Sequence, residues 1–313
     1  MSSWVRCALA LALSAIFASG ASARETIIAE HVLGPEGPLF VDGKLYYVAW
    51  NPGSLSVSDG KTSKVINDAP GCSHNGLALT PRRTLLLACS DAHGAILELD
   101  LSGKELRRWR ADDRGLGFDG GINDVVVTAN GGAYATVFGP FADKPTAIVG
   151  RIVYMAPGSD RWTEVANDLN YANGVAVSPD QKTLYLDEMG SNSVISFAIG
   201  PDGSLSSRAN FVRLDLLIPA KARKWWAGPD SLKVDSKGDL YVAQFYGGRI
   251  LKISPDGKLI HVFDIAAGNG TTNVAFGPGE KDLYVSVVRN ADDIAGKAEG
   301  SVVRIPNVRR PQK

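Results

Sequence analysis

The feature that most constrains the fold is a short motif that recurs six times along the chain. It is clearest at residues 170–186, where an alternating apolar strand, a turn at Ser178-Pro179-Asp180 and a second apolar strand follow one another. Variants of this motif begin near residues 34, 73, 122, 172, 229 and 272. A repeat of about 40 to 50 residues indicates stacked units that bury a continuous core together.

Each unit offers several short strands, and no segment has the pattern of a long amphipathic helix. Turn residues fall at intervals of about ten residues, which is typical of an all-β chain. The sequence therefore predicts an all-β fold, a six-bladed β-propeller, in which an extra strand at residues 26–29 completes the last blade. A pair of β-sandwich domains is the alternative, and the repeated hairpin favours the propeller.

Residues 1–23 have the pattern of a signal peptide. Arg6 is their only charged side chain, an apolar run covers residues 7–18, and the segment finishes at Ala21-Ser22-Ala23. The run is shorter than the roughly 20 residues that favour a membrane anchor, and no later segment is long enough. We expect residues 24–313 to form a single exported domain, periplasmic or secreted, with no membrane attachment after signal removal.

Charge and cysteine content narrow the partners and the compartment. The 33 basic and 33 acidic side chains give a formal net charge of zero, which argues against nucleic acid and favours a small-molecule partner. Nothing in the sequence points to an oligomeric state. Signal removal also removes Cys7 and leaves Cys72 and Cys89, which flank a predicted hairpin and are interpreted either as a disulfide or as two buried thiols.

Polar residues precede the first strand of every unit. The first strands of a propeller lie nearest its axis, so we expect these residues to meet at one mouth of the central channel. They are Glu36, Asn75, Asn123 with Asp124, Asn173, Asp230 and Asn273. Carboxylate and amide oxygens without His or Cys suit a hard cation such as calcium, magnesium or manganese better than zinc. Asn-Gly and Pro-Asp pairs also form turns that cap strands; this role is at least as well supported for Asn75 and Asn273, whereas Glu36, Asn173 and Asp230 together favour a metal.

Four motifs carry a family resemblance. They are residues 34–38, Asn123-Asp124, residues 172–180, and residues 229–235 with 239–243. In their order and spacing the sequence resembles the gluconolactonase, senescence-marker-protein and luciferin-regenerating-enzyme family. The resemblance implies a six-bladed propeller that hydrolyses lactones with one divalent cation on its axis, calcium foremost and magnesium, manganese or zinc as alternatives. It implies that Glu36, Asn173 and Asp230 ligate the metal and that Asn123 contacts metal or substrate.

The resemblance has one departure. Gly121 stands where animal gluconolactonases carry an Arg two residues before the Asn that matches Asn123. A sugar-acid lactone therefore does not follow as the substrate.

The leading hypothesis is metal-assisted lactone hydrolysis with Asp230 and Asn123 as catalytic residues. The cation would polarise the ring carbonyl, and Asp230 is the best candidate to activate the attacking water. Two alternatives remain: hydrolysis of organophosphates or esters on the same fold, and a propeller that binds a ligand without catalysis.

The ends of the second strands should supply the shape of the mouth. The residues expected there are Trp50, Asp91, His93, Phe138, Phe141, Glu188, Met189, Phe245, Tyr246 and Arg289, and Trp225 and Trp226 join them from just ahead of the fifth unit. Packing between blades is an equally good role for each aromatic side chain. His74 and His93 are candidates for a proton shuttle, although surface or capping roles are favoured.

Overall fold

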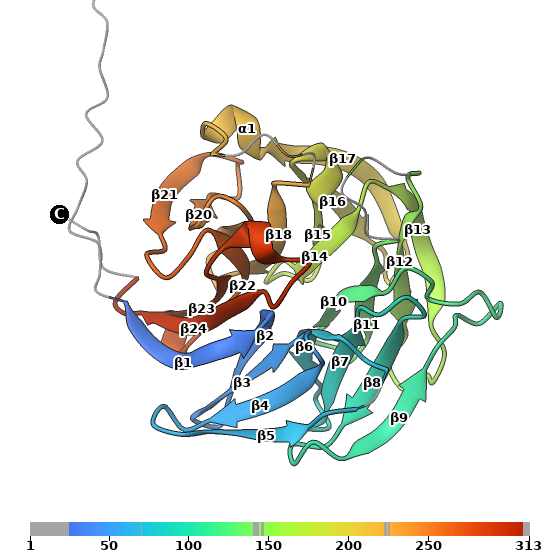
Figure 1. Cartoon of the computed structure of the whole chain (residues 1–313). Helices are drawn as coiled ribbons and strands as arrows, with labels where there is room; N and C mark the ends of the chain where they lie inside the picture. The colour runs from blue at the N-terminus through green and yellow to red at the C-terminus, as the bar shows by residue number, and fades with distance from the viewer. Residues whose placement is uncertain are drawn as a thin grey trace, which may run out of the picture.

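Six four-stranded antiparallel sheets surround a central axis in the computed structural model of the chain (Figure 1). The structure describes residues 25–69, 71–139, 144, 147–221, 224 and 226–308. The expected signal peptide lies outside these residues. The predicted six-bladed β-propeller is confirmed.

The blades follow one another along the chain, each running from the axis outward. The first three are β2 (Pro35–Val41), β3 (Lys44–Ala49), β4 (Ser54–Ser58) and β5 (Ser63–Asn67); β6 (His74–Leu79), β7 (Leu85–Cys89), β8 (Ala95–Leu99) and β9 (Glu105–Trp109); and β10 (Ile122–Val127), β11 (Ala133–Val137), β12 (Gly150–Met155) and β13 (Thr163–Leu169). The next two are β14 (Ala172–Val177), β15 (Thr183–Glu188), β16 (Ser193–Ile199) and β17 (Leu205–Arg213); and β18 (Pro229–Val234), β19 (Leu240–Gln244), β20 (Arg249–Ile253) and β21 (Leu259–Asp264).

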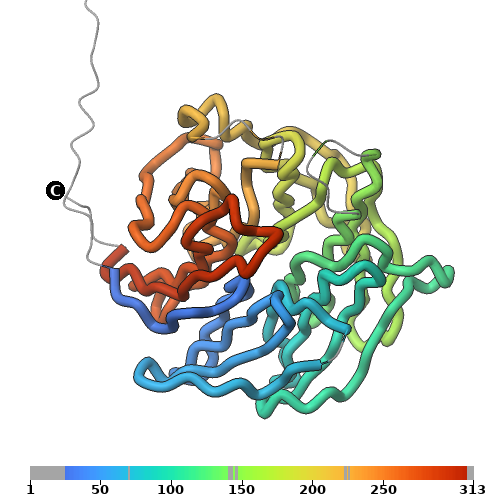
Figure 2. The backbone as a smooth tube through the Cα atoms, viewed as in Figure 1, coloured from blue at the N-terminus to red at the C-terminus, as the bar shows by residue number. Residues whose placement is uncertain are grey.

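The sixth blade contains both the first and the last described strands. It comprises β22 (Gly270–Phe276), β23 (Leu283–Val288), β24 (Glu299–Ile305) and β1 (Thr26–Leu33). Strand β1 pairs with β24, with Val32 opposite Gly300, and Figure 2 shows the two ends of the described chain side by side, blue against red. The predicted closing strand is confirmed, and it extends beyond residues 26–29.

The core lies between neighbouring blades. Strand β7 is buried along its whole length, because both of its faces pack against adjacent sheets. One cluster joins Ile96 of β8 to Val125 of β10, with Phe118 and Trp162 filling the space between them. The outermost strands, such as β9, are the exposed edges of the blades. Short helical turns are confined to connections: α1 (Leu214–Leu217), η1 (Met189–Ser191), η2 (Pro278–Glu280) and η3 (Ala291–Asp293).

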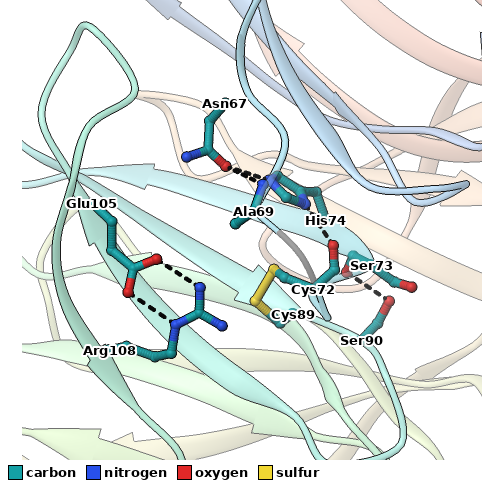
Figure 3. The surroundings of a disulfide bond; sticks show 9 residues. All are labelled: Asn67, Ala69, Cys72, Ser73, His74, Cys89, Ser90, Glu105 and Arg108. Atoms are coloured by element: carbon teal, nitrogen blue, oxygen red, sulfur yellow. Dashed lines mark hydrogen bonds and ion pairs between the residues drawn. A yellow bond between two sulfur atoms is a disulfide. The ribbon is translucent and has the colours of Figure 1, made fainter.

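Cys72 and Cys89 form a disulfide that ties the start of β6 to the end of β7 (Figure 3). Of the two interpretations of these cysteines, the structure selects the bridge. His74 lies beside it, fully buried, with Nδ1 bonded to the carbonyl oxygen of Cys72 at 2.7 Å and Nε2 to Oδ1 of Asn67 at 2.9 Å. Both ring nitrogens of His74 are thus engaged in local structure.

Within the described ranges, the helices are all too short or too polar to cross a membrane.

Candidate metal centre and active site

All six inner strands break their register at the same level of the propeller. The breaks fall between residues 36 and 39, 74 and 77, 122 and 125, 172 and 175, 229 and 232, and 271 and 273. Such bulges remove residues from the hydrogen-bonded ladder and redirect their side chains. The predicted axial residues lie inside these strands, at or beside the breaks, so the prediction that they precede the strands was wrong. The error arose because pairing resumes on the far side of each bulge.

Five of the predicted axial residues meet at one cavity of about 270 Å³. They are Glu36, Asn75, Asn123, Asn173 and Asp230. All five are buried. The four residues proposed as metal ligands are therefore brought together, and Asn75 joins them.

Asn-Gly pairs allow the inner strands to approach one another closely here. A Cβ atom on Gly174 would lie 2.5 Å from the Cα of Ser231 and 2.9 Å from Oδ2 of Asp187. Only glycine fits between these atoms. The Asn173-Gly174 pair therefore belongs to a strand-to-strand contact and not to a turn.

Glu36 is held in place by two hydrogen bonds to its Oε2 atom. The backbone N–H of Gly37 donates at 2.7 Å and Nδ2 of Asn273 donates at 2.8 Å. The Oδ1 atom of Asn273 in turn accepts from the backbone N–H of Val274 at 2.8 Å, which fixes the orientation of its amide. Asn273 thus orients Glu36 from behind and does not line the cavity.

The surroundings of the two carboxyl groups in the cavity do not stabilise their ionised forms. Burial raises the pKa of Glu36 to about 7, although its hydrogen bonds act in the opposite direction. Burial also raises the pKa of Asp230 well above its ordinary value, and the negative charge of Glu36 adds to this effect. Among the described residues that line the cavity there is no Lys, Arg or His. A bound cation would relieve this imbalance.

Two amide oxygens at the cavity are buried without hydrogen-bond partners. These are Oδ1 of Asn75 and Oδ1 of Asn173. A buried acceptor without a partner is destabilising, so such atoms indicate a missing ligand or functional role. Within the described residues no three His, Cys, Asp or Glu side chains could hold a metal ion together. A cation would therefore need these amide oxygens as well as the carboxylates, and oxygen-only coordination fits a hard ion such as calcium.

A second polar layer lies next to the site. Asp124 is buried, and its Oδ2 accepts hydrogen bonds from Oγ of Ser231 at 3.0 Å and Nζ of Lys233 at 3.2 Å. Both carboxyl oxygens of Asp187 are buried without a partner, and burial raises its pKa well above the ordinary value. The sequence interpretation missed Asp187 and Lys233 as members of this layer.

The wall of the cavity is mainly aromatic. Its described members are Trp50, Ser90, Phe138, Tyr171, Met189, Trp226, Phe245, Ile294 and Ala295. Five of these were predicted, namely Trp50, Phe138, Met189, Trp226 and Phe245. The prediction missed Tyr171, Ser90, Ile294 and Ala295, which lie in connections whose path depends on the folded ring. Phe141 and Trp225 lie outside the described residues.

The remaining predicted wall residues do not line this cavity. They are Asp91, His93, Glu188, Tyr246 and Arg289. Glu188 pairs with Arg208 at 2.6 Å, and Arg289 pairs with Glu299 at 3.2 Å. The side chain of His93 is 86% exposed and lies 3.7 Å from Asp119. Neither His74 nor His93 is therefore placed to shuttle protons at the site, which agrees with the favoured capping and surface roles.

The chain is similar in sequence to proteins of a known family. The model for the SMP-30/gluconolactonase/LRE-like region matches residues 34–289. The chain is 30% identical over 200 residues to lactonase drp35 of Staphylococcus saprophyticus, covering 62% of this chain and 58% of that protein. It is 29% identical over 184 residues to lactonase drp35 of Staphylococcus epidermidis, covering 57% and 53%. The chain thus spans about half the length of the curated relatives it matches.

Solved structures share the fold at lower identity. A gluconolactonase from Xanthomonas campestris superposes with a TM-score of 0.73 at 21% identity, covering 91% of this chain and 90% of that one. A luciferin-regenerating enzyme superposes with a TM-score of 0.71 at 20% identity, covering 91% of this chain and 96% of that one. A calcium-binding protein, regucalcin, from Agrobacterium tumefaciens superposes with a TM-score of 0.66 at 21% identity, covering 91% of this chain and 93% of that one. Because its family model covers residues 34–289, this chain belongs to the SMP-30/gluconolactonase/LRE-like family.

Proposed function

We propose that this protein is a divalent-metal-dependent hydrolase that opens a lactone ring. The observation that carries the proposal is the convergence of two buried carboxyl groups and three amide side chains at one cavity, with two amide oxygens lacking partners. The resemblance to the drp35 lactonases and to a gluconolactonase supports the reaction class.

Glu36, Asn123, Asn173 and Asp230 would hold the cation, with Asn75 beside them. Calcium is the favoured ion because all of these donors are oxygens, and a structural neighbour is named as a calcium-binding protein. Magnesium and manganese are alternatives, and zinc is the least favoured because no His or Cys lines the described cavity. When bound, such an ion supplies Lewis acidity to a carbonyl oxygen.

The chain's own residues divide the remaining work. Asp230 would take the proton from the attacking water, since Oε2 of Glu36 is already engaged by the N–H of Gly37 and Nδ2 of Asn273. Asn123 would orient the ester oxygen or the water through its amide. The largely aromatic wall would limit the access of bulk water and so strengthen the electrostatic interactions inside the cavity.

The test is a panel of lactones and phosphotriesters, assayed with calcium and after removal of metal by a chelator. We expect lactone turnover that disappears on chelation and returns when calcium is restored. Turnover of phosphotriesters alone would favour the alternative reaction on the same fold. Tight ligand binding without any turnover would contradict the enzyme proposal.

We also propose that the protein is exported. The signal-peptide pattern at residues 1–23 motivates this, and the Cys72–Cys89 disulfide supports it because such bridges persist mainly in oxidising compartments. Fractionation of expressing cells, with sequencing of the mature N-terminus, checks the proposal. An uncleaved protein in the cytosolic fraction would contradict it.

A further inference from the structure

The wall of the cavity offers few partners for a hydroxylated substrate. Apart from the polar residues at the bulges, the described side chains that line it are apolar or aromatic, with Ser90 and Tyr171 as the hydroxyl groups. Oγ of Ser90 already donates to the carbonyl oxygen of Ser73 at 3.1 Å. A sugar lactone would bury several hydroxyl groups, and each one left without a partner weakens binding.

Position 121 has no room for a longer side chain. Its φ of +101° suits glycine. A Cβ atom there would lie 2.9 Å from a ring carbon of Phe138 and 2.9 Å from the carbonyl carbon of Ser90. The ring of Phe138 therefore occupies the space that a polar arm from position 121 would need.

The aromatic side chains of the wall support one another. Phe138 meets Tyr171 edge-on with ring centroids 5.2 Å apart, and Trp226 lies 5.6 Å from Phe245. These rings belong to one buried cluster with Met189. Rings fixed in this way present a preformed apolar surface to a ligand.

Lys224, which lies against Trp226 of the wall, is already paired with an acidic side chain. Nζ of Lys224 bonds to the hydroxyl of Tyr246 at 2.6 Å, pairs with Asp292, and lies 5.6 Å from the ring centroid of Trp226. It is not among the residues that line the cavity. An anionic substituent on the substrate would therefore meet no positively charged partner in the described wall.

We infer that the substrate is a lactone with an apolar alkyl or aryl substituent, which lies against Phe138, Trp226 and Phe245. This inference rests on the proposed lactone hydrolysis and specifies its substrate class. The carbonyl would face the polar residues at the bulges, and the substituent would face the aromatic wall. Each buried methylene should raise kcat/KM about fourfold until the wall is covered.

The test uses the calcium-loaded full-length protein and a series of δ-lactones whose alkyl substituent grows from hydrogen to hexyl, with gluconolactone as the hydroxylated comparison. We expect kcat/KM to rise with each methylene and to exceed the value for gluconolactone. A flat series, or preference for gluconolactone, would overturn the inference while leaving lactone hydrolysis intact.

Binding of the matching δ-lactams, which resist hydrolysis, separates the two proposals. Tighter lactam binding with chain length, without turnover of any lactone, would support the apolar subsite and contradict the reaction. Lactam affinity independent of chain length would overturn the subsite. Titration calorimetry measures both.

Two variants locate the subsite. Phe138→Asn should reduce kcat/KM for the hexyl lactone at least tenfold more than for the unsubstituted ring. Because Phe138 is buried and its loss could disturb folding, Ile294→Ser at a half-buried position of the wall provides a second, milder test in the same direction. Val65→Ser, at a site 54% exposed on β5, is the control and should leave the series unchanged. An equal effect of Phe138→Asn and Ile294→Ser on all ring substituents would overturn the assignment.

Discussion

Nδ2 of Asn273 donates a hydrogen bond to Oε2 of Glu36 at 2.8 Å, across 237 positions of sequence. The bond joins β22 of the last blade to β2 of the first, and Oγ1 of Thr272 adds a second link by donating to the carbonyl oxygen of Pro35 at 2.7 Å. The contact that closes the ring therefore also orients Glu36, a proposed metal ligand. The site is complete only when the first and last blades meet.

Replacing Asn273 by Ala should weaken calcium binding by about 10- to 100-fold, because partners that orient a metal ligand typically contribute this much. Titration calorimetry on the metal-free protein measures the change. The control is Asn210→Ala on the exposed outer strand β17. Unchanged calcium affinity in Asn273→Ala would show that the hydrogen bond from Asn273 is not needed to orient Glu36.

Asp230→Asn should lower the lactonase rate by roughly 10² to 10⁴-fold, the usual contribution of a general base. The amide keeps an oxygen donor of similar shape, so calcium should remain bound at saturating concentration. Elemental analysis together with the rate assay checks both expectations. A metal-loaded variant with full activity would rule out Asp230 as the base.

The raised pKa of Glu36, about 7 against an ordinary 4.5, makes the metal-free protein sensitive to pH. The folded state binds this proton more tightly than the unfolded chain, so the contribution to stability is present below about pH 4.5 and is lost as the pH rises toward 7. Between pH 5 and 7 we expect the unfolding free energy of the wild type to fall by about 2 kcal/mol relative to that of Glu36→Gln, as measured by urea titrations. Excess calcium, which stabilises the ionised form, should reverse the trend, and a flat difference would contradict the burial argument.

Lys233→Met removes the cation that pairs with Asp124, whose side chain is 1% exposed. Loss of one partner of a buried pair leaves an uncompensated charge, and we expect a destabilisation of about 3 kcal/mol. The matched control is Lys258→Met, since Lys258 is 80% exposed in its pair with Asp256 and should change stability by less than about 1 kcal/mol. Urea unfolding of both variants measures the contrast. Equal stability of the two would mean that Asp124 does not depend on Lys233.

The double variant Cys72→Ser with Cys89→Ser should lose about 3 kcal/mol of stability, as expected for a bridge that closes a loop of 17 residues. Reducing agent should produce the same loss in the wild type and none in the variant. Denaturation with and without reductant measures this. If the unfolding free energy of the wild type does not change with reductant, the two cysteines do not form a disulfide in solution.

The fold was readable from the sequence because its signals are local. Alternating apolar residues specify strands, and turns such as the one at Ser178-Pro179-Asp180 specify hairpins, whatever the rest of the chain does. Their sixfold recurrence then leaves a propeller as the natural way to bury every unit. The polar axial set followed from the same repeat, since equivalent positions in equivalent blades must lie near one axis. The family resemblance then singled out Glu36, Asn123, Asn173 and Asp230 within that set.

Tertiary structure decided what each polar residue does. The bulges turned Asn75 into the cavity, while Asn273 reached Glu36 from the neighbouring blade and Lys233 reached Asp124 from two blades away. The sequence determined six equivalent blades and a polar axial set. It left open the register breaks and the Cys72–Cys89 bridge, because these depend on the detailed geometry within single hairpins. It also missed Ser90, Tyr171, Ile294 and Ala295 of the cavity wall, because these lie in connections whose path depends on the folded ring.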